Sequence, residues 1–258
     1  MIGAIAGDII GSVYEWNNVQ TKNFELFGQK SEFTDDSVLT AAIADSILSS
    51  TPYSVKLREY FNKYPNAGYG GMFITWALTP GAGPYNSYGN GSAMRVSPVG
   101  WAYDDIETVI SEAKKSAQCT HNHPEGIKGA QAVAAAIFLA RKKESMSAIK
   151  SFISNKFGYD LNRDPNMIRE AGYKFDVSCQ GSVPEAIIAF LCSDSFENAI
   201  RKAIWIGGDS DTIACITGSI AEAFYDGVPD SIRKETFDRL DENLKDITNK
   251  FISKYVLK

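Results

Sequence analysis

The stretch Ala130-Gln-Ala-Val-Ala-Ala-Ala-Ile-Phe-Leu-Ala-Arg141 decides the fold class of this chain. The run from Ala132 to Ala140 is too apolar for a helix with one solvated face, and it indicates a helix that is buried on all sides. Six further segments repeat apolar residues at helical spacing: 36–48, 106–117, 185–191, 196–206, 212–225 and 231–256. Because no segment alternates convincingly between apolar and polar residues, the sequence predicts an all-α fold.

No internal repeat, low-complexity tract or long linker divides the chain. Its 258 residues, of which 44% are hydrophobic and 22% charged, are enough to bury one large core. We therefore expect a single domain over residues 1–258.

Charge, cysteines and the first residues restrict the environment and the partners. The net charge is −5 and no block of Lys or Arg occurs, so the electrostatic signature of a general nucleic-acid binder is missing. Four widely spaced cysteines are typical of free core residues in a reducing compartment. The apolar start lacks a basic region and is interrupted by Asp8, unlike a signal peptide or a membrane span. We expect a cytoplasmic monomer with no membrane contact.

Two short acidic clusters each precede a predicted helix: Thr34-Asp35-Asp36-Ser37 and Gly207-Gly208-Asp209-Ser210-Asp211-Thr212. Asp, Ser and Thr are preferred helix N-caps, and acidic side chains suit the positive end of a helix. Capping uses one side chain, however, whereas each cluster has two carboxylates and a threonine. If the two helix starts meet in space, four carboxylates converge and need cations to offset their repulsion. Oxygen ligands suit Mg²⁺, Mn²⁺ or Ca²⁺, commonly as a pair of ions about 3.5–4 Å apart.

Three other features carry weaker signals. Residues 66–90 are rich in glycine and aromatic residues, which is typical of a functional loop or of a short helix between two loops. The two histidines lie in His121-Asn-His123-Pro124-Glu125, where His121 fits a ligand contact and His123-Pro124 fits a helix start. Gly3, Gly7 and Gly11 recur every four residues and allow close helix packing.

Five motifs in order along the chain resemble those of the ADP-ribosylglycohydrolase family. This family includes the dinitrogenase reductase-activating glycohydrolases and the ADP-ribosylserine and ADP-ribosylarginine hydrolases. The motifs are Gly7-Asp8-x-x-Gly11, Thr34-Asp35-Asp36, Gly89-Asn90-Gly91-x-Ala93-Met94-Arg95, Thr120-His121 and Gly208-Asp209-x-Asp211-Thr212. Each motif is short, but five of them in this order and at family-like separations make a specific match.

The resemblance implies an orthogonal helical bundle with a binuclear Mg²⁺ or Mn²⁺ centre in a cleft. The positions that match the family's metal ligands are Thr34, Asp35, Asp36, Asp209, Asp211 and Thr212. The positions that match its ADP-ribose contacts are Gly70, Gly71, Asn86, Ser87, Tyr88, Asn90 and His121. Glu15 resembles the mobile acidic residue of the serine-directed members.

The activity implied by the resemblance is metal-dependent hydrolysis of the glycosidic bond between ADP-ribose and a modified protein, nucleic acid or small molecule. The transition state of such a reaction has oxocarbenium character and needs a positioned water and an activated leaving group. We expect Asp35 or Asp36 to orient or deprotonate the water, and Glu15 to act near the leaving group or to gate the cleft. No Asp or Glu occurs between Glu59 and Asp104, where some arginine-directed members have an acidic residue, and this favours an O-linked substrate.

Two alternatives remain open from the sequence. A non-catalytic module that binds ADP-ribose would share the fold, but it would have no need of four clustered carboxylates. A Mg²⁺-dependent prenyl-diphosphate enzyme is also all-α and holds its metal between two acidic motifs. Against it, Ser37, Val38 and Leu39 follow Asp36 where a further acidic residue is expected.

Overall fold

The computed structural model describes residues 1–256, and their regular secondary structure is helical, which confirms the predicted all-α class. In chain order the helices are α1 (Ile2–Gly11), α2 (Asp35–Ser49), α3 (Tyr53–Lys63), α4 (Gly71–Leu78), α5 (Gly91–Met94), α6 (Ser97–Ala102), α7 (Ile106–Gln118), α8 (Pro124–Arg141), α9 (Met146–Phe157), α10 (Pro165–Glu170), α11 (Cys179–Leu191), α12 (Phe196–Ile206), α13 (Ser210–Phe224), α14 (Asp230–Asp238) and α15 (Glu242–Tyr255). Gly89 and Ser178 form an isolated bridge, and no strand occurs in residues 1–256.

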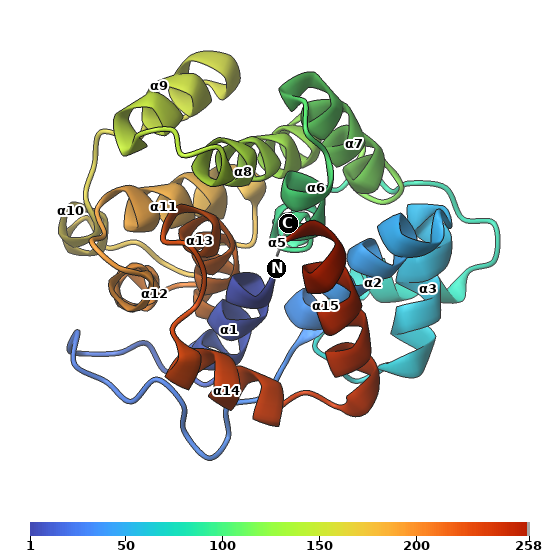
Figure 1. Ribbon diagram of the computed structural model, residues 1–258, viewed down its shortest axis with the longest axis horizontal. Helices are drawn as coiled ribbons and strands as arrows, with labels where there is room; N and C mark the ends of the chain where they lie inside the picture. Colours follow the sequence, from blue (N-terminus) through green and yellow to red (C-terminus); the bar gives the residue numbers. More distant parts are fainter. Residues whose placement is uncertain (257–258) are drawn as a thin grey trace.

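Helix α13 is central to the fold, and α1 packs against it (Figure 1). All residues of α1 are buried, as are those of α13 from Ser210 to Ala223. The two helices approach closely because α1 presents glycines to α13: a Cβ on Gly7 would lie 2.0 Å from the Ala214 carbonyl oxygen. The packing role predicted for the glycines of α1 is thereby confirmed.

The remaining helices surround this pair (Figure 1). In the view of Figure 1, α2, α3 and α15 lie on one side, α11 and α12 lie on the other, and α8 runs across with α7 and α9 beside it. Residues 132–138 of α8 are all buried, which confirms the prediction of a helix buried along its apolar run.

Side-chain caps mark several helix starts. Thr34 caps α2 by accepting the Asp36 amide at 3.3 Å. The Nδ1 atom of His123 caps α8 by accepting the Glu125 amide at 3.1 Å, so the predicted structural role of His123 is confirmed. The prediction of one helix over 231–256 was wrong: α14 ends at Asp238, and Asp241 caps a new helix by accepting the amide of Leu244.

Residues 66–90 contain one short helix, α4, between two irregular segments, which is one of the two arrangements that the glycine content predicts. The four cysteines Cys119, Cys179, Cys192 and Cys215 are free. None of the helices in residues 1–256 combines the length and the apolar character that crossing a membrane requires.

Candidate metal centre and ligand cleft

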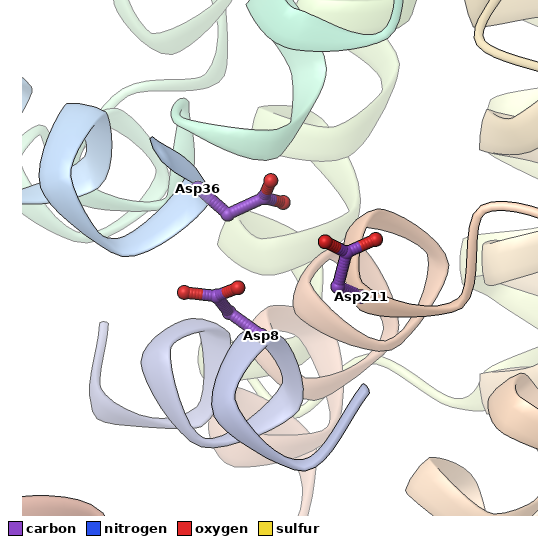
Figure 2. Close-up of side chains that lie close together, drawn as sticks. All are labelled: Asp8, Asp36 and Asp211. Carbon is purple, nitrogen blue, oxygen red and sulfur yellow. The ribbon is translucent and has the colours of Figure 1, made fainter. Parts of the chain in front are cut away.

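Three buried carboxylates from three helices meet at one point. Figure 2 shows Asp8 of α1, Asp36 of α2 and Asp211 of α13 with their carboxyl groups turned toward one another. One oxygen of each lies within 4.8 Å of the others, and no more than 6% of any of the three residues is exposed. The two acidic turns of the sequence therefore lie side by side, and α1 adds a further carboxylate.

Asp8 is a site residue that the sequence prediction did not include. Its carboxylate accepts the amides of Thr34 and Ser37 at 2.9 and 3.1 Å, the Thr34 hydroxyl at 2.6 Å, and the Ser37 hydroxyl. These four bonds involve both oxygens and satisfy amides at the start of α2. Asp8 therefore fixes the turn that carries Asp35 and Asp36. Two signals were available: the motif Gly7-Asp8-x-x-Gly11, and an acidic residue inside an otherwise apolar helix.

Glycine backbone conformations shape the turn before α13. Gly207 and Gly208 have φ angles of +86° and +74°, which residues with a Cβ rarely adopt. The Gly208 amide donates a hydrogen bond of 2.6 Å to Asn18 Oδ1, in the loop after α1. This contact holds the turn beside the end of α1.

Hydrogen bonds also connect the second acidic turn to its surroundings. Thr212 donates to Asp36 Oδ2 at 3.3 Å, which joins the two acidic turns directly. Asn90, just before α5, donates to Asp209 Oδ2 at 2.6 Å. Thr212 and Asn90 were both predicted site residues, and the structure places them in contact with predicted metal ligands.

Burial and mutual repulsion raise the pKa values of these carboxyl groups. Asp35, Asp36 and Asp211 have pKa values well above the usual range, first because they are buried and then because other carboxylates lie nearby. Burial is also the main cause that raises the pKa of Asp209 to about 6. In the absence of cations, the folded protein therefore retains protons that free carboxyl groups would release.

Glu15 forms a second group with Asp209 and Asp211. One oxygen of each of these three residues again lies within 4.8 Å of the others. Burial, followed by the charge of Asp211, raises the pKa of Glu15 to about 7. The two groups of carboxylates share Asp211, which therefore lies at the middle of the acidic centre.

The donor atoms of this centre fit a divalent cation. Asp36 Oδ1 is buried and has no hydrogen-bond partner among the described residues, although buried carboxylate oxygens normally have one. The side chains that converge here offer carboxylate and hydroxyl oxygens, without histidine or cysteine. Such donors bind Mg²⁺, Mn²⁺ or Ca²⁺ in preference to Zn²⁺.

A cleft of about 450 Å³ contains this centre. The predicted site residues that line it are Glu15, Thr34, Asp35, Asp36, Gly70, Gly71, Ser87, Asn90, His121, Asp209, Asp211 and Thr212. Asn86 and Tyr88 are not among the residues that line it. The Asn86 amide donates to Asn122 at 2.7 Å, and the Tyr88 ring packs edge-on against His123. Their contact with ADP-ribose stays a prediction.

Several residues line the cleft that the sequence did not assign to the site. They are Leu39, Gly68, Met72, Phe73, Tyr85, Gly89, Gly91, Met94, Arg95, Phe175 and Val177. Phe175 stacks on Trp16 with the ring centroids 5.1 Å apart, although 74% of Trp16 is exposed. This contact joins the loop after α1 to the loop before α11. Gly89, Gly91, Met94 and Arg95 belong to one of the five sequence motifs, although they were not assigned to the site. Periodicity gave no signal for the others, because most of them lie in irregular segments or resemble ordinary core residues.

A second hollow of about 560 Å³ adjoins the cleft. Glu15, Thr34 and Gly68 line both spaces. The second hollow is further lined by aromatic, amide and charged side chains, among them Trp16, Tyr64, Asn66, Lys30 and Glu32. Glu15 therefore stands where the two spaces meet.

Comparison with known proteins assigns this fold and site to a family. The family model for ADP-ribosylglycohydrolase matches residues 1–256. ADP-ribosylhydrolase ARH3 of Homo sapiens is 28% identical over 314 aligned positions, covering 90% of this chain and 86% of the relative. ADP-ribosylarginine hydrolase Tri1 of Pseudomonas putida is 25% identical, covering 87% of this chain and 69% of the relative. A solved structure described as an ADP-ribosylglycohydrolase-related protein complex shares the fold, with a TM-score of 0.71 and 24% identity over 94% of this chain and 95% of that one.

The fold and the family model define an enzyme of the ADP-ribosyl glycohydrolase class. The chain belongs to the ADP-ribosylglycohydrolase family. This confirms the resemblance drawn from the five sequence motifs. It also sets aside the prenyl-diphosphate enzyme as a description of the chain.

Proposed function

We propose that this enzyme uses two metal ions to hydrolyse an O-glycosidic bond between ADP-ribose and a protein side chain. The observation that carries the proposal is the meeting of the Thr34–Asp36 and Asp209–Thr212 turns at one cleft. Glu15, between this cleft and the adjoining hollow, marks the place where the bond would be cleaved.

The two acidic turns supply the ligands for two Mg²⁺ or Mn²⁺ ions: Thr34, Asp35, Asp36, Asp209, Asp211 and Thr212. When bound, such ions would offset the repulsion of the carboxylates, lower the pKa of a water and orient ribose hydroxyls. Asp8 is a positioning residue and not a ligand in this proposal, because its oxygens already accept four hydrogen bonds. Asp35 or Asp36 orients the attacking water.

The rest of ADP-ribose would lie along the wall of the cleft that carries the glycines. A Cβ on Gly70 or Gly71 would meet no atom within 4 Å, so a ligand can approach this backbone directly. Helix α4 begins at Gly71, and the free amides of a helix start favour phosphate oxygens. Phe73 and Val177 add apolar surface to the same cleft.

In this proposal, Glu15 protonates the leaving group. Hydrolysis breaks the bond between C1 of ribose and the target oxygen, adds the water oxygen to C1 and transfers a proton to the target oxygen. A target in the second hollow and ADP-ribose in the cleft would meet beside Glu15, which lines both. An alkoxide needs this proton, whereas an arginine guanidinium already carries its positive charge. The lack of acidic residues between Glu59 and Asp104 further supports an O-linked substrate.

The second hollow fits a protein target better than a nucleic acid. Its lining contains one basic residue, Lys30, beside the acidic residues Glu15 and Glu32. A nucleic-acid backbone requires several cations to neutralise its phosphates. A peptide is neutral along its backbone, and it can hydrogen-bond to groups such as the Asn66 amide.

Release of free ADP-ribose from a small panel of substrates tests this proposal. The panel contains a serine-linked peptide, an arginine-linked peptide and ADP-ribosylated nucleic acid, each with Mg²⁺ or with EDTA. We expect Mg²⁺-dependent release from the serine-linked peptide. Release from the arginine-linked peptide alone, or from the nucleic acid alone, would overturn the proposed O-linkage to a protein. Full release in EDTA would overturn the proposed role of the metal ions.

A further inference from the structure

Arg95 is a fully buried cation that lines the cleft without an acidic partner. It follows α5 and has 0% exposure, and no carboxylate pairs with it in residues 1–256. Its Nη2 atom donates to Thr120 Oγ1 at 2.7 Å and to the Ser116 carbonyl at 3.2 Å, whereas Nε and Nη1 have no hydrogen-bond partner. Because a buried, unpaired charge is costly, its retention beside a ligand cleft calls for a specific role.

Thr120 connects Arg95 to the imidazole of His121. Thr120 Oγ1 lies 2.7 Å from His121 Nδ1 and 3.4 Å from the Ala117 carbonyl. The hydroxyl has a single proton, and the histidine nitrogen is much the nearer acceptor. The bond from Arg95 draws electron density from this oxygen, which makes the hydroxyl a better donor to Nδ1. When the hydroxyl donates to Nδ1, the proton of the neutral His121 ring is on Nε2.

The Nε2 side of His121 faces Gly89 and Gly91, which line the cleft. A Cβ on Gly91 would lie 3.3 Å from Nε2, and one on Gly89 would lie 3.6 Å from it. His121 is 5% exposed and lines the cleft. Burial, followed by the charge of Arg95, lowers the pKa of His121 well below its usual range. The ring is therefore neutral, and its one N–H group is available to a ligand.

We propose that Arg95 and Thr120 are positioning residues that hold His121 as the neutral tautomer with its proton on Nε2, aimed at a ligand oxygen. This inference rests on the proposed function in one respect, namely that ADP-ribose occupies the cleft. The acceptor is an anionic oxygen of the diphosphate, because the uncompensated charge of Arg95 stands directly behind the donor. His121 is thus a fixed hydrogen-bond donor and takes no part in proton transfer.

Nitrogen NMR of the histidine rings tests the tautomer without any ligand. The chain has two histidines, so uniform ¹⁵N-histidine labelling gives two sets of ring signals. A His123→Ser variant, in which Ser can still cap α8, assigns them. We expect His121 to show a proton on Nε2 and none on Nδ1, unchanged from pH 6 to pH 8. A proton on Nδ1, or a doubly protonated ring at pH 7, would overturn the proposal.

A matched pair of variants then tests the role of the hydroxyl. Thr120→Val removes the bond to Nδ1 and should produce a mixture of tautomers and weaken ADP-ribose binding about fivefold, the equivalent of one hydrogen bond. Thr120→Ser keeps the hydroxyl and should show the single tautomer and the ADP-ribose affinity of the wild type. If Thr120→Val retains the tautomer and the affinity, the connection through Thr120 is wrong. If wild-type protein does not bind ADP-ribose, the proposed function fails while the ring signals still decide the tautomer.

Discussion

Neutralising one carboxylate of the acidic centre should stabilise the metal-free protein. Burial raises the pKa of Asp209 to about 6 from its usual value of 3.8. The folded state therefore binds this proton more tightly than the unfolded state, and stability is lost as pH rises from about 4 to 6. Asparagine has the same shape without the charge, and its carbonyl oxygen can still accept the bond from Asn90. Asp209→Asn thus removes the carboxyl group whose ionisation lowers the stability of the folded protein.

The size of the effect follows from the shift in pKa. A shift of about two units corresponds to roughly 3 kcal/mol at pH 7.5, where the wild-type carboxylate is ionised in both states. For a chain of this length, that difference should raise the unfolding midpoint by roughly 6–12 °C. Near pH 3.5 the carboxyl is largely protonated in both states, so the difference between variant and wild type should shrink to a few tenths of a kcal/mol.

Thermal and urea unfolding in EDTA and in Mg²⁺ provide the assay. Mg²⁺ at a hundredfold excess over its Kd should stabilise the wild type by about 2.7 kcal/mol and close the gap to the variant, which should gain little and lack activity. The exposed Glu144→Gln is the charge-matched control and should behave as wild type. The reasoning is refuted if Asp209→Asn is less stable than wild type in EDTA at pH 7.5. Equal stabilisation of both proteins by Mg²⁺ would remove Asp209 from the ligands.

Two further substitutions test the packing and the chemistry. Gly7→Ala should reduce the free energy of unfolding by about 3 kcal/mol or more in urea titrations, because its Cβ would lie 2.0 Å from the Ala214 carbonyl oxygen. Gly28→Ala, whose Cβ would meet its nearest atom at 4.0 Å, is the control, and equal losses in the two variants would contradict the close packing of α1 on α13. Glu15→Gln should lower the rate of release from a serine-linked peptide roughly 100- to 10,000-fold and that from an arginine-linked peptide less, as measured by single-turnover assays. Equal losses on both substrates would show that Glu15 does not protonate the leaving group.

The helical class could be predicted because helical periodicity is a local property. The segment 196–206 was predicted with the bounds that α12 has, and α7 ends one residue beyond the predicted 106–117. The break between α14 and α15 was missed because apolar residues continue at helical spacing across it. The signal for the break was the capping residue Asp241.

The parts of the site could be predicted, but their assembly could not. Each acidic turn is a short motif at a helix start, so the residue types alone indicate oxygen ligands for a cation. Asp8 is different, because its role depends on Thr34 and Ser37, which are 26 and 29 positions away. No local pattern reveals such contacts. They follow from the close packing of α1 on α13 and α2, which only the folded chain shows.

The cleft contains both a cluster of carboxylates and an unpaired cation. A single negatively charged ligand can bind beside both only when metal ions offset the charge of the carboxylates. The acidic turns place Asp35, Asp36, Asp209 and Asp211 in the same cleft as the unpaired cation Arg95. The absence of an ion pair between Arg95 and these carboxylates implies that the two charges are held apart by the fold. Divalent ions can offset the carboxylates, but they would only add to the uncompensated charge of Arg95. A ligand with an uncharged sugar at one end and a diphosphate beyond it supplies hydroxyls to the ions and negative charge to the region of Arg95. For this reason, ADP-ribose and the metal ions should bind cooperatively, each more tightly when the other is present.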